Sequence, residues 1–147
     1  MTRTILLPTD GSATARAARH VAAHMARGTG DSVLVFAVAE PADYDGVEDE
    51  AVTAAISNYL RQAAEGEAAA LRAEGVEATV AVDICSRVDA AILDQARKVG
   101  ADLIIMGTHG RTGLARAVIG SVADRVLRHS EIPVLLVRLV TQRDAGE

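Results

Sequence analysis

The 147-residue chain contains one cysteine, no tryptophan, two tyrosines and one phenylalanine. The single cysteine, Cys85, cannot form an internal disulfide and has no neighbouring cysteine with which to share a metal ion, so a disulfide scaffold is excluded. No apolar run approaches the roughly 18 residues that span a bilayer, and the first four residues lead into a strand rather than a secretory hydrophobic segment. These absences predict a cytoplasmic protein that does not cross a membrane, with Cys85 an ordinary small residue beside a strand.

Basic residues are outnumbered by acidic ones, 15 against 20, and the net charge is −5. This balance excludes a nucleic-acid surface as the main function, because such a surface needs an excess of Lys and Arg. Half of the residues are apolar, which suffices for a core in one domain of this length. We expect a single domain over residues 1–140 and a frayed tail over residues 141–147.

Apolar runs alternate with helical periodicity along the whole chain. Helices are predicted at 13–27 with Ser12 as the cap, from Val52 to a stop at Gly75, at 89–99 and at 122–129. Apolar runs predict strands at 4–8, 33–39, 76–84, 102–106 and 132–137. Five strands alternating with four helices predict an α/β fold: an open, Rossmann-like parallel sheet with helices on both faces. Ligands of such sheets bind beyond the carboxyl ends of the strands.

The segment Gly107-Thr108-His109-Gly110, followed nine residues later by Gly120-Ser121, links a predicted strand to a predicted helix. Glycines there permit a close approach of the main chain to a ligand, and the N–H groups of the first helical turn are free to bind an anion. A Walker loop is excluded because the only lysine, Lys98, lies upstream, and the dinucleotide pattern fails because the glycines are each three apart. The loop therefore predicts phosphate binding by backbone groups.

Three other groups of residues have simpler interpretations. His20 and His24 share a helix face, but no third ligand is predicted near them, so surface or packing roles are favoured over a zinc site. His109 could bind phosphate, yet a structural or solvent-facing role is favoured because loop positions between glycines serve varied purposes. An acidic run over residues 43–50 could coordinate a cation, but a solvated loop that leads into a helix N-terminus explains it more simply.

The chain resembles the universal stress protein family, in its single-domain ATP-binding form, over nearly its whole length. The resemblance lies in residues 5–12, 100–113 and 129–138. It also lies in a spacing pattern in which two residues separate Gly107 from Gly110, and nine residues separate Gly110 from Gly120-Ser121. The family also resembles adenine nucleotide α-hydrolases in fold. The chain departs from the family after the third strand, where residues 85–88, Cys-Ser-Arg-Val, replace a turn that usually contains glycine.

The resemblance implies a set of ATP-binding residues. The phosphates are held by Gly107, Gly110, Gly120 and Ser121, and the adenosine lies against Asp10 and Val38. Asp10 either accepts from ribose hydroxyls or supports a Mg²⁺ that is held mainly by the phosphates. Further candidates are Thr9 and Met106 for the adenosine and His109, Arg111 and Thr112 for the phosphates.

Three functions are compatible with this pattern. The first is a nucleotide-dependent regulator of a stress response, because no Glu, Gln or His is placed where hydrolysis requires a base. The second is a slow ATP-hydrolysing or nucleotidyl-transferring enzyme, and the third is a nucleotide-free stress protein that acts through protein contacts. Residues 134–137, an uncharged edge strand, and the family resemblance both predict a homodimer.

Overall fold

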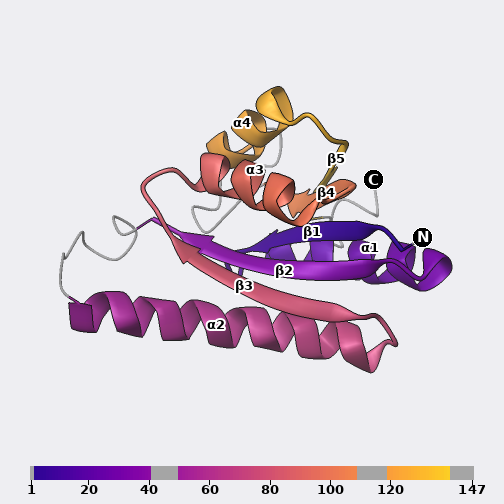
Figure 1. Cartoon of the computed structure of the whole chain (residues 1–147), viewed down its shortest axis with the longest axis horizontal. Coiled ribbons are helices and arrows are strands. Elements are labelled where there is room, and N and C mark those ends of the chain that lie inside the picture. Colours follow the sequence, from indigo (N-terminus) through magenta and orange to yellow (C-terminus); the bar gives the residue numbers. More distant parts are fainter. Residues whose placement is uncertain (1, 41–49, 109–118, 140–147) are drawn as a thin grey trace, which may run out of the picture.

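The computed structural model describes residues 2–40, 50–108 and 119–139, and strands alternate with helices throughout. Their order is the predicted one (Figure 1). The elements are β1 (Thr4–Thr9), α1 (Ala13–Thr29), β2 (Ser32–Ala39), α2 (Glu50–Ala73), β3 (Ala78–Ile84), α3 (Val88–Val99), β4 (Leu103–Gly107), α4 (Ser121–His129) and β5 (Val134–Val137). The sequence placed the starts of β3 and β5 two residues too early. At β5 the reason is Pro133, which has no N–H to give to a ladder.

All the strand pairs are parallel, and the sheet order is β3-β2-β1-β4-β5. β1 is central and pairs with β2 on one side and β4 on the other, as in the register Thr9↔Ala37 and Leu6↔Ile104. The chain therefore runs outward from β1 to β3 and then returns to add β4 and β5 on the opposite side. This reversal creates a topological switch point between β1 and β4, where α/β sheets bind ligands.

Helices cover both faces of the sheet, as predicted, and each face has its own core. α1 and α2 pack with Ile5 and Leu7 of β1, whereas α3 and α4 pack with Leu6. Neighbouring residues of β1 point to opposite faces because side chains alternate along a strand. Figure 1 shows α2 beneath the sheet and α3 and α4 above it.

Local signals in the sequence fix the ends of the helices. The Ser12 hydroxyl accepts a hydrogen bond from the Ala15 N–H at 3.2 Å and caps α1, as predicted. α1 and α3 end at Gly30 and Gly100, which have φ of 77° and 63°, and Gly75 after α2 has φ of 81°. Glycine is favoured at these positions because other residues rarely adopt this left-handed backbone.

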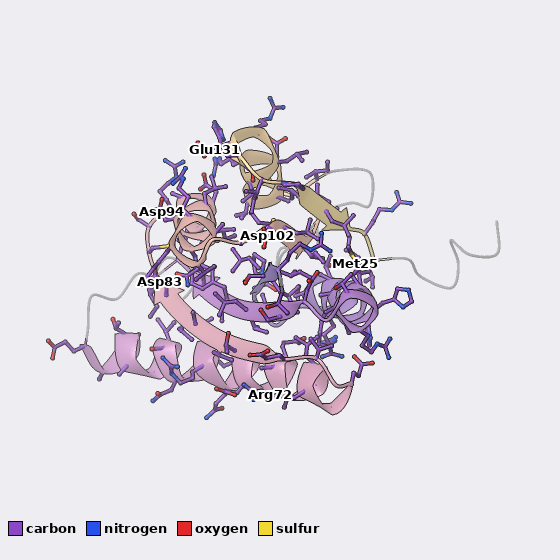
Figure 2. The ribbon with its side chains drawn as sticks, turned by 45° about the vertical axis from the view of Figure 1, so that its right-hand side comes forward. Met25, Arg72, Asp83, Asp94, Asp102 and Glu131 are labelled. Carbon is purple, nitrogen blue, oxygen red and sulfur yellow. The ribbon has the colours of Figure 1, made fainter. Side chains whose placement is uncertain are left out.

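Polar side chains tie the layers together at two places. Arg19 of α1 and Glu67 of α2 form an ion pair at 3.0 Å in which Glu67 is buried. Arg72 of α2, labelled in Figure 2, donates Nε and Nη2 to the Ala78 carbonyl at 3.1 and 2.9 Å. This contact covers one carbonyl at the open edge of β3, which limits unwanted strand pairing there.

Candidate functional site

The carboxyl ends of β2, β1 and β4 lie side by side and bring together three of the predicted site residues. Asp10 directly follows β1, Val38 is the residue after the partner of Thr9 in β2, and Gly107 ends β4. Val38 lies inside β2, within the strand predicted over residues 33–39, whereas Gly107, predicted just beyond the strand of residues 102–106, is the last residue of β4. β2 ends at Ala39, as predicted, and β4 ends one residue later than predicted because its pairing with β5 continues to Gly107↔Val137.

The turn after β1 holds the carboxylate of Asp10 in place. Its Oδ1 accepts a hydrogen bond from the Ser12 N–H at 2.9 Å, and Thr9 Oγ1 accepts one from the Gly11 N–H at 3.2 Å. Gly11 makes the turn possible with a φ of 83°. Oδ2 of Asp10 has no hydrogen bond among the described residues, and the side chain is partly exposed. A fixed carboxylate with one free oxygen can accept from a ligand hydroxyl or bind a cation.

The two ends of the β4–α4 connection are joined by backbone hydrogen bonds. The Gly120 N–H donates to the Thr108 carbonyl at 2.7 Å, and the Thr108 N–H donates to the Val137 carbonyl at 3.0 Å. These bonds place the start of α4 next to the end of β4, at the same edge as Asp10. Of the predicted loop residues, Gly110, His109, Arg111 and Thr112 lie outside the described residues.

The first turn of α4 has unsatisfied backbone donors. Gly120 is the N-cap and gives no side-chain cap, and the first hydrogen bond of the helix runs from the Asp124 N–H to the Gly120 carbonyl. The N–H groups of Ser121, Val122 and Ala123 therefore have no partner in the described part of the chain. Ser121 is exposed and adds a hydroxyl. This combination of free N–H groups, a helix dipole and a hydroxyl is suited to an anion.

The structure explains the need for glycine at position 107 differently from the sequence, which suggested a close approach of a ligand. A Cβ at this position would lie 2.5 Å from Thr14 Cγ2 and 3.1 Å from the Thr14 carbonyl carbon. Gly107 is also not among the glycines with positive φ. Packing of α1 against β4 thus accounts for this glycine without any ligand.

Three of the candidate adenosine contacts are core residues. The side chains of Val38 and Met106 belong to the core beneath α3 and α4, and Thr9 is also buried. They shape the end of the sheet from within, and they offer a ligand their backbone groups and the tips of their side chains at most.

Arg87, at the start of α3, is a polar residue of this edge that sequence reasoning did not single out as a site residue. Its Nε and Nη2 donate to Oδ1 and Oδ2 of Asp89 at 3.2 and 3.0 Å. These hydrogen bonds lower the pKa of the buried Asp89 carboxyl, and the positive charge of Arg125 on α4 adds to the effect. The departure from the family at residues 85–88 was the signal that could have identified it.

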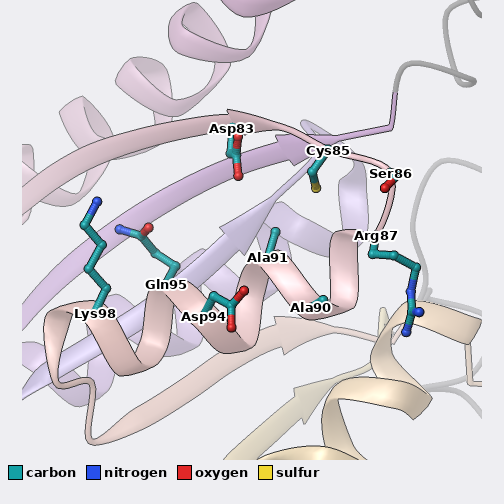
Figure 3. A pocket seen from close by; sticks show the side chains of 9 residues that line it. All are labelled: Asp83, Cys85, Ser86, Arg87, Ala90, Ala91, Asp94, Gln95 and Lys98. Atoms are coloured by element: carbon teal, nitrogen blue, oxygen red, sulfur yellow. The ribbon is translucent and has the colours of Figure 1, made fainter.

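A groove of about 270 Å³ runs between the end of β3 and the outer face of α3 (Figure 3). Asp83 and Cys85 line its β3 side, and Asp94, Gln95 and Lys98 line its α3 side. Burial raises the pKa of the Cys85 thiol, which keeps the thiol protonated at neutral pH and unreactive as a nucleophile. Cys85 packs against the core below α3, in agreement with the sequence interpretation.

The other sequence candidates are the two histidines of α1 and the acidic run before α2. His20 and His24 are both exposed on α1, and the described residues contain no cluster of three or more metal-ligating side chains. Glu50 begins α2 as the acidic residue of its first turn, and the rest of the acidic run lies outside the described residues. None of the helices in residues 2–40, 50–108 and 119–139 is long and apolar enough to cross a membrane.

Comparisons with known proteins agree with this architecture. The universal stress protein family model matches residues 1–138. A universal stress protein of Thermus aquaticus is 37% identical over 139 residues, which cover 94% of this chain and 100% of that protein. The structure of the hypothetical protein MJ0577 of Methanocaldococcus jannaschii superposes with a TM-score of 0.85 at 26% identity, covering 97% of this chain and 99% of that chain.

A universal stress protein of Archaeoglobus fulgidus, solved in complex with dAMP, shares the fold with a TM-score of 0.61 at 23% identity and covers 94% of this chain and 98% of that chain. The family model, the curated relative and the superposed structures all span nearly the whole sequence. The chain therefore belongs to the universal stress protein family.

Proposed function

We propose that this protein binds ATP at the carboxyl edge of its sheet, with the phosphates at the first turn of α4 and the adenosine beside Asp10 and Val38. The observation that carries the proposal is the uncapped start of α4, where three backbone N–H groups and the Ser121 hydroxyl have no partner among the described residues. The Gly120–Thr108 hydrogen bond supports it by holding this turn next to β4. Gly107 and Gly110 complete the predicted loop.

The residues at this edge fit the chemistry of a nucleotide. Free N–H groups at a helix N-terminus suit phosphate oxygens, and a carboxylate with one free oxygen suits ribose hydroxyls. The dAMP complex of the Archaeoglobus fulgidus relative supports an adenine nucleotide as the ligand class. Mg²⁺ would be held mainly by the phosphates, with Oδ2 of Asp10 as the one protein ligand that the turn leaves free.

We infer that binding, rather than turnover, is the output, and that the protein is a nucleotide-dependent regulator in a stress response. Hydrolysis requires a base that positions water as well as a phosphate site. Asp10 and Glu40 are carboxylates at this edge, and Oδ1 of Asp10, the one beside the start of α1, already accepts from the Ser12 N–H. Slow or absent hydrolysis follows from this arrangement.

We also propose a cytoplasmic homodimer, one domain per subunit, joined through β5. β5 is an edge strand of four residues, and Leu135 and Leu139 expose 37% and 39% of their surfaces. An apolar edge strand in water is a site for pairing with another chain, and a second copy would cover it.

Isothermal titration of the full-length protein with ATP·Mg²⁺ tests the proposal. We expect saturable heat with one nucleotide per chain, and no steady release of ADP, or of AMP and pyrophosphate, in a parallel turnover assay. Absence of heat at millimolar nucleotide would overturn the binding proposal. Multiple turnovers per minute would instead favour the slow enzyme.

A further inference from the structure

We propose that Arg87 is a phosphate-binding residue of the nucleotide site, which makes the site selective for nucleotides that carry a phosphate chain over adenosine itself. This inference rests on the function proposed above, and it concerns a residue that the family resemblance does not supply. Arg87 lies in the segment of residues 85–88 where this chain departs from the family pattern.

The position of Arg87 places it at the correct edge of the sheet. Arg87 is the N-cap of α3 and directly precedes this helix, three residues after β3 ends. Arg87 lies at the end of the groove between β3 and α3, where Figure 3 shows its side chain beside the first turn of α3. Its guanidinium group pairs with Asp89, whose carboxyl also feels the charge of Arg125 on α4.

The guanidinium group of Arg87 is held in place by Asp89, and part of its hydrogen-bonding capacity remains available. Nε and Nη2 are engaged by Asp89, whose side chain is 6% exposed, whereas the side chain of Arg87 is 65% exposed. Nη1 has no hydrogen-bond partner in the described part of the chain. A buried carboxylate thus orients an arginine that offers its remaining N–H groups to solvent. Such a preorganised guanidinium is well suited to phosphate oxygens.

Charged neighbours connect Arg87 to both ends of the proposed site. The hydrogen bonds and charge of Asp89 raise the pKa of the Arg87 guanidinium most, and Glu40, directly after β2 and two residues beyond Val38, adds a smaller attraction. Arg125, which helps to lower the pKa of Asp89, lies one helical turn after Ser121 on α4. The Arg87–Asp89 pair therefore interacts with charges on both Glu40, at the end of β2, and Arg125, on α4.

Carboxylates at this edge oppose a polyphosphate, and Arg87 joins Arg16, whose Nη1 donates to the Gly11 carbonyl at 3.4 Å, among the cations that offset them. Asp10 and Glu40 place two carboxylates there, and both repel a polyphosphate. The only lysine, Lys98, is near the opposite end of α3. Arg87 offsets this repulsion. Adenosine has no phosphate and is not repelled, so its binding does not require Arg87.

A purely structural role for the Arg87–Asp89 pair is the competing explanation. It would stabilise the start of α3, and its loss would lower the melting temperature without distinguishing ligands. Arg97 of α3 provides a control for the loss of an exposed arginine, because it pairs with the exposed Asp94 at 2.8 Å at the other end of the helix.

The experiment compares Arg87→Ala, Arg87→Gln and Arg97→Ala with the wild type by calorimetric titration with ATP·Mg²⁺ and with adenosine. We expect both Arg87 variants to weaken ATP binding about tenfold, as for the loss of one charge-assisted hydrogen bond, and to leave adenosine binding within about twofold. The salt dependence of ATP binding should also become shallower. Arg97→Ala should match the wild type. Arg87→Gln retains a hydrogen-bond donor for Asp89, so it reports on the phosphate even if Arg87→Ala is poorly folded.

Two results would overturn the inference: unchanged ATP affinity in both Arg87 variants, or an equal loss for ATP and adenosine. Failure of the wild type to bind ATP would overturn the proposed function itself. The two failures are therefore distinguishable. If the wild type and the folded Arg87 variants bind ATP equally well, the proposed function stands and only the role of Arg87 is refuted.

Discussion

The methyl group of Thr14 in α1 fills the space beside Gly107 in β4, so that a Cβ on Gly107 would lie 2.5 Å from it. Real Cβ atoms essentially never approach another atom so closely. The Thr14 backbone is also near, at 3.1 Å, so a rotation of the side chain cannot relieve the clash fully. The N-terminus of α1 and the end of β4 are therefore fixed against each other at the edge where we place the nucleotide.

Gly107→Ala should destabilise the protein by about 1–3 kcal/mol, because the added methyl group overpacks this contact. Urea unfolding at pH 7 measures the loss. Thr14→Ser in the Gly107→Ala background removes Cγ2 and should recover part of the loss. If Gly107→Ala unfolds like the wild type, the contact between α1 and β4 is looser than the structure indicates.

Ser121→Pro should weaken ATP binding about tenfold or more, because proline removes one backbone N–H and the hydroxyl from the first turn of α4. The fold should tolerate it, since proline is favoured at the first helical position and Gly120 has the extended backbone that precedes proline (φ −61°, ψ 154°). Calorimetric titration with ATP·Mg²⁺ measures the effect.

Two controls accompany that variant. Ser121→Ala retains the N–H and should lose less affinity. Ala13→Pro makes the same change at the first position of α1, after the extended Ser12, and should leave ATP binding unchanged. A larger loss in Ala13→Pro than in Ser121→Pro would place the phosphates at α1 instead of α4.

Asp31 should make the stability of the protein depend on pH in the acid range. A hydrogen bond with the Thr29 side chain lowers the pKa of this buried carboxyl most. The backbone N–H and the guanidinium group of Arg3 lower the pKa further, whereas burial raises it. A group with a lowered pKa in the folded state stabilises the protein above its unfolded pKa of about 3.9. That contribution is lost as the pH falls through the folded value.

Asp31→Asn should therefore lower the free energy of unfolding by about 1–3 kcal/mol at pH 7, and the difference from the wild type should shrink below about pH 4. Urea unfolding at a series of pH values measures it. Asp94→Asn, at a carboxylate that is 74% exposed, should change little at any pH. If the difference in unfolding free energy between Asp31→Asn and the wild type stays constant down to pH 3, the assigned direction of the Asp31 pKa is contradicted.

Leu135→Lys should convert the proposed dimer into a monomer, because it places a charge on the exposed edge strand β5. Light scattering at micromolar concentration measures the mass. Leu127→Lys on α4 is the matched control, since Leu127 is also exposed but lies outside β5. Dimers that persist in Leu135→Lys, or that are lost in Leu127→Lys, would move the interface away from β5.

Much of this architecture could be read from the sequence because its signals are local. The apolar run before Asp10 and the cap at Ser12 fixed the first strand and helix, and Gly75 marked the end of α2. Family resemblance supplied the candidate nucleotide residues. The part of the chain that the structure describes confirms that Asp10, Val38 and Gly107 share one edge, while ATP binding by these residues stays a prediction.

Other features could not be predicted because they depend on contacts between distant segments. Nothing near Gly107 in the sequence reveals that Thr14, 93 positions earlier, occupies its Cβ space. Arg87 likewise showed only a break in a family pattern, and its orientation follows from the buried Asp89 and the packing of α3 on α4.

The sequence by itself determined the alternation of strands and helices, their caps and the family, because hydrophobic periodicity and turn residues act over a few positions. The tertiary structure alone decided the strand order β3-β2-β1-β4-β5, the hydrogen bond that joins Gly120 to Thr108, and the pairing of Arg87 with Asp89. These depend on how buried faces meet across the sheet, which is a property of the packed chain and of no single segment.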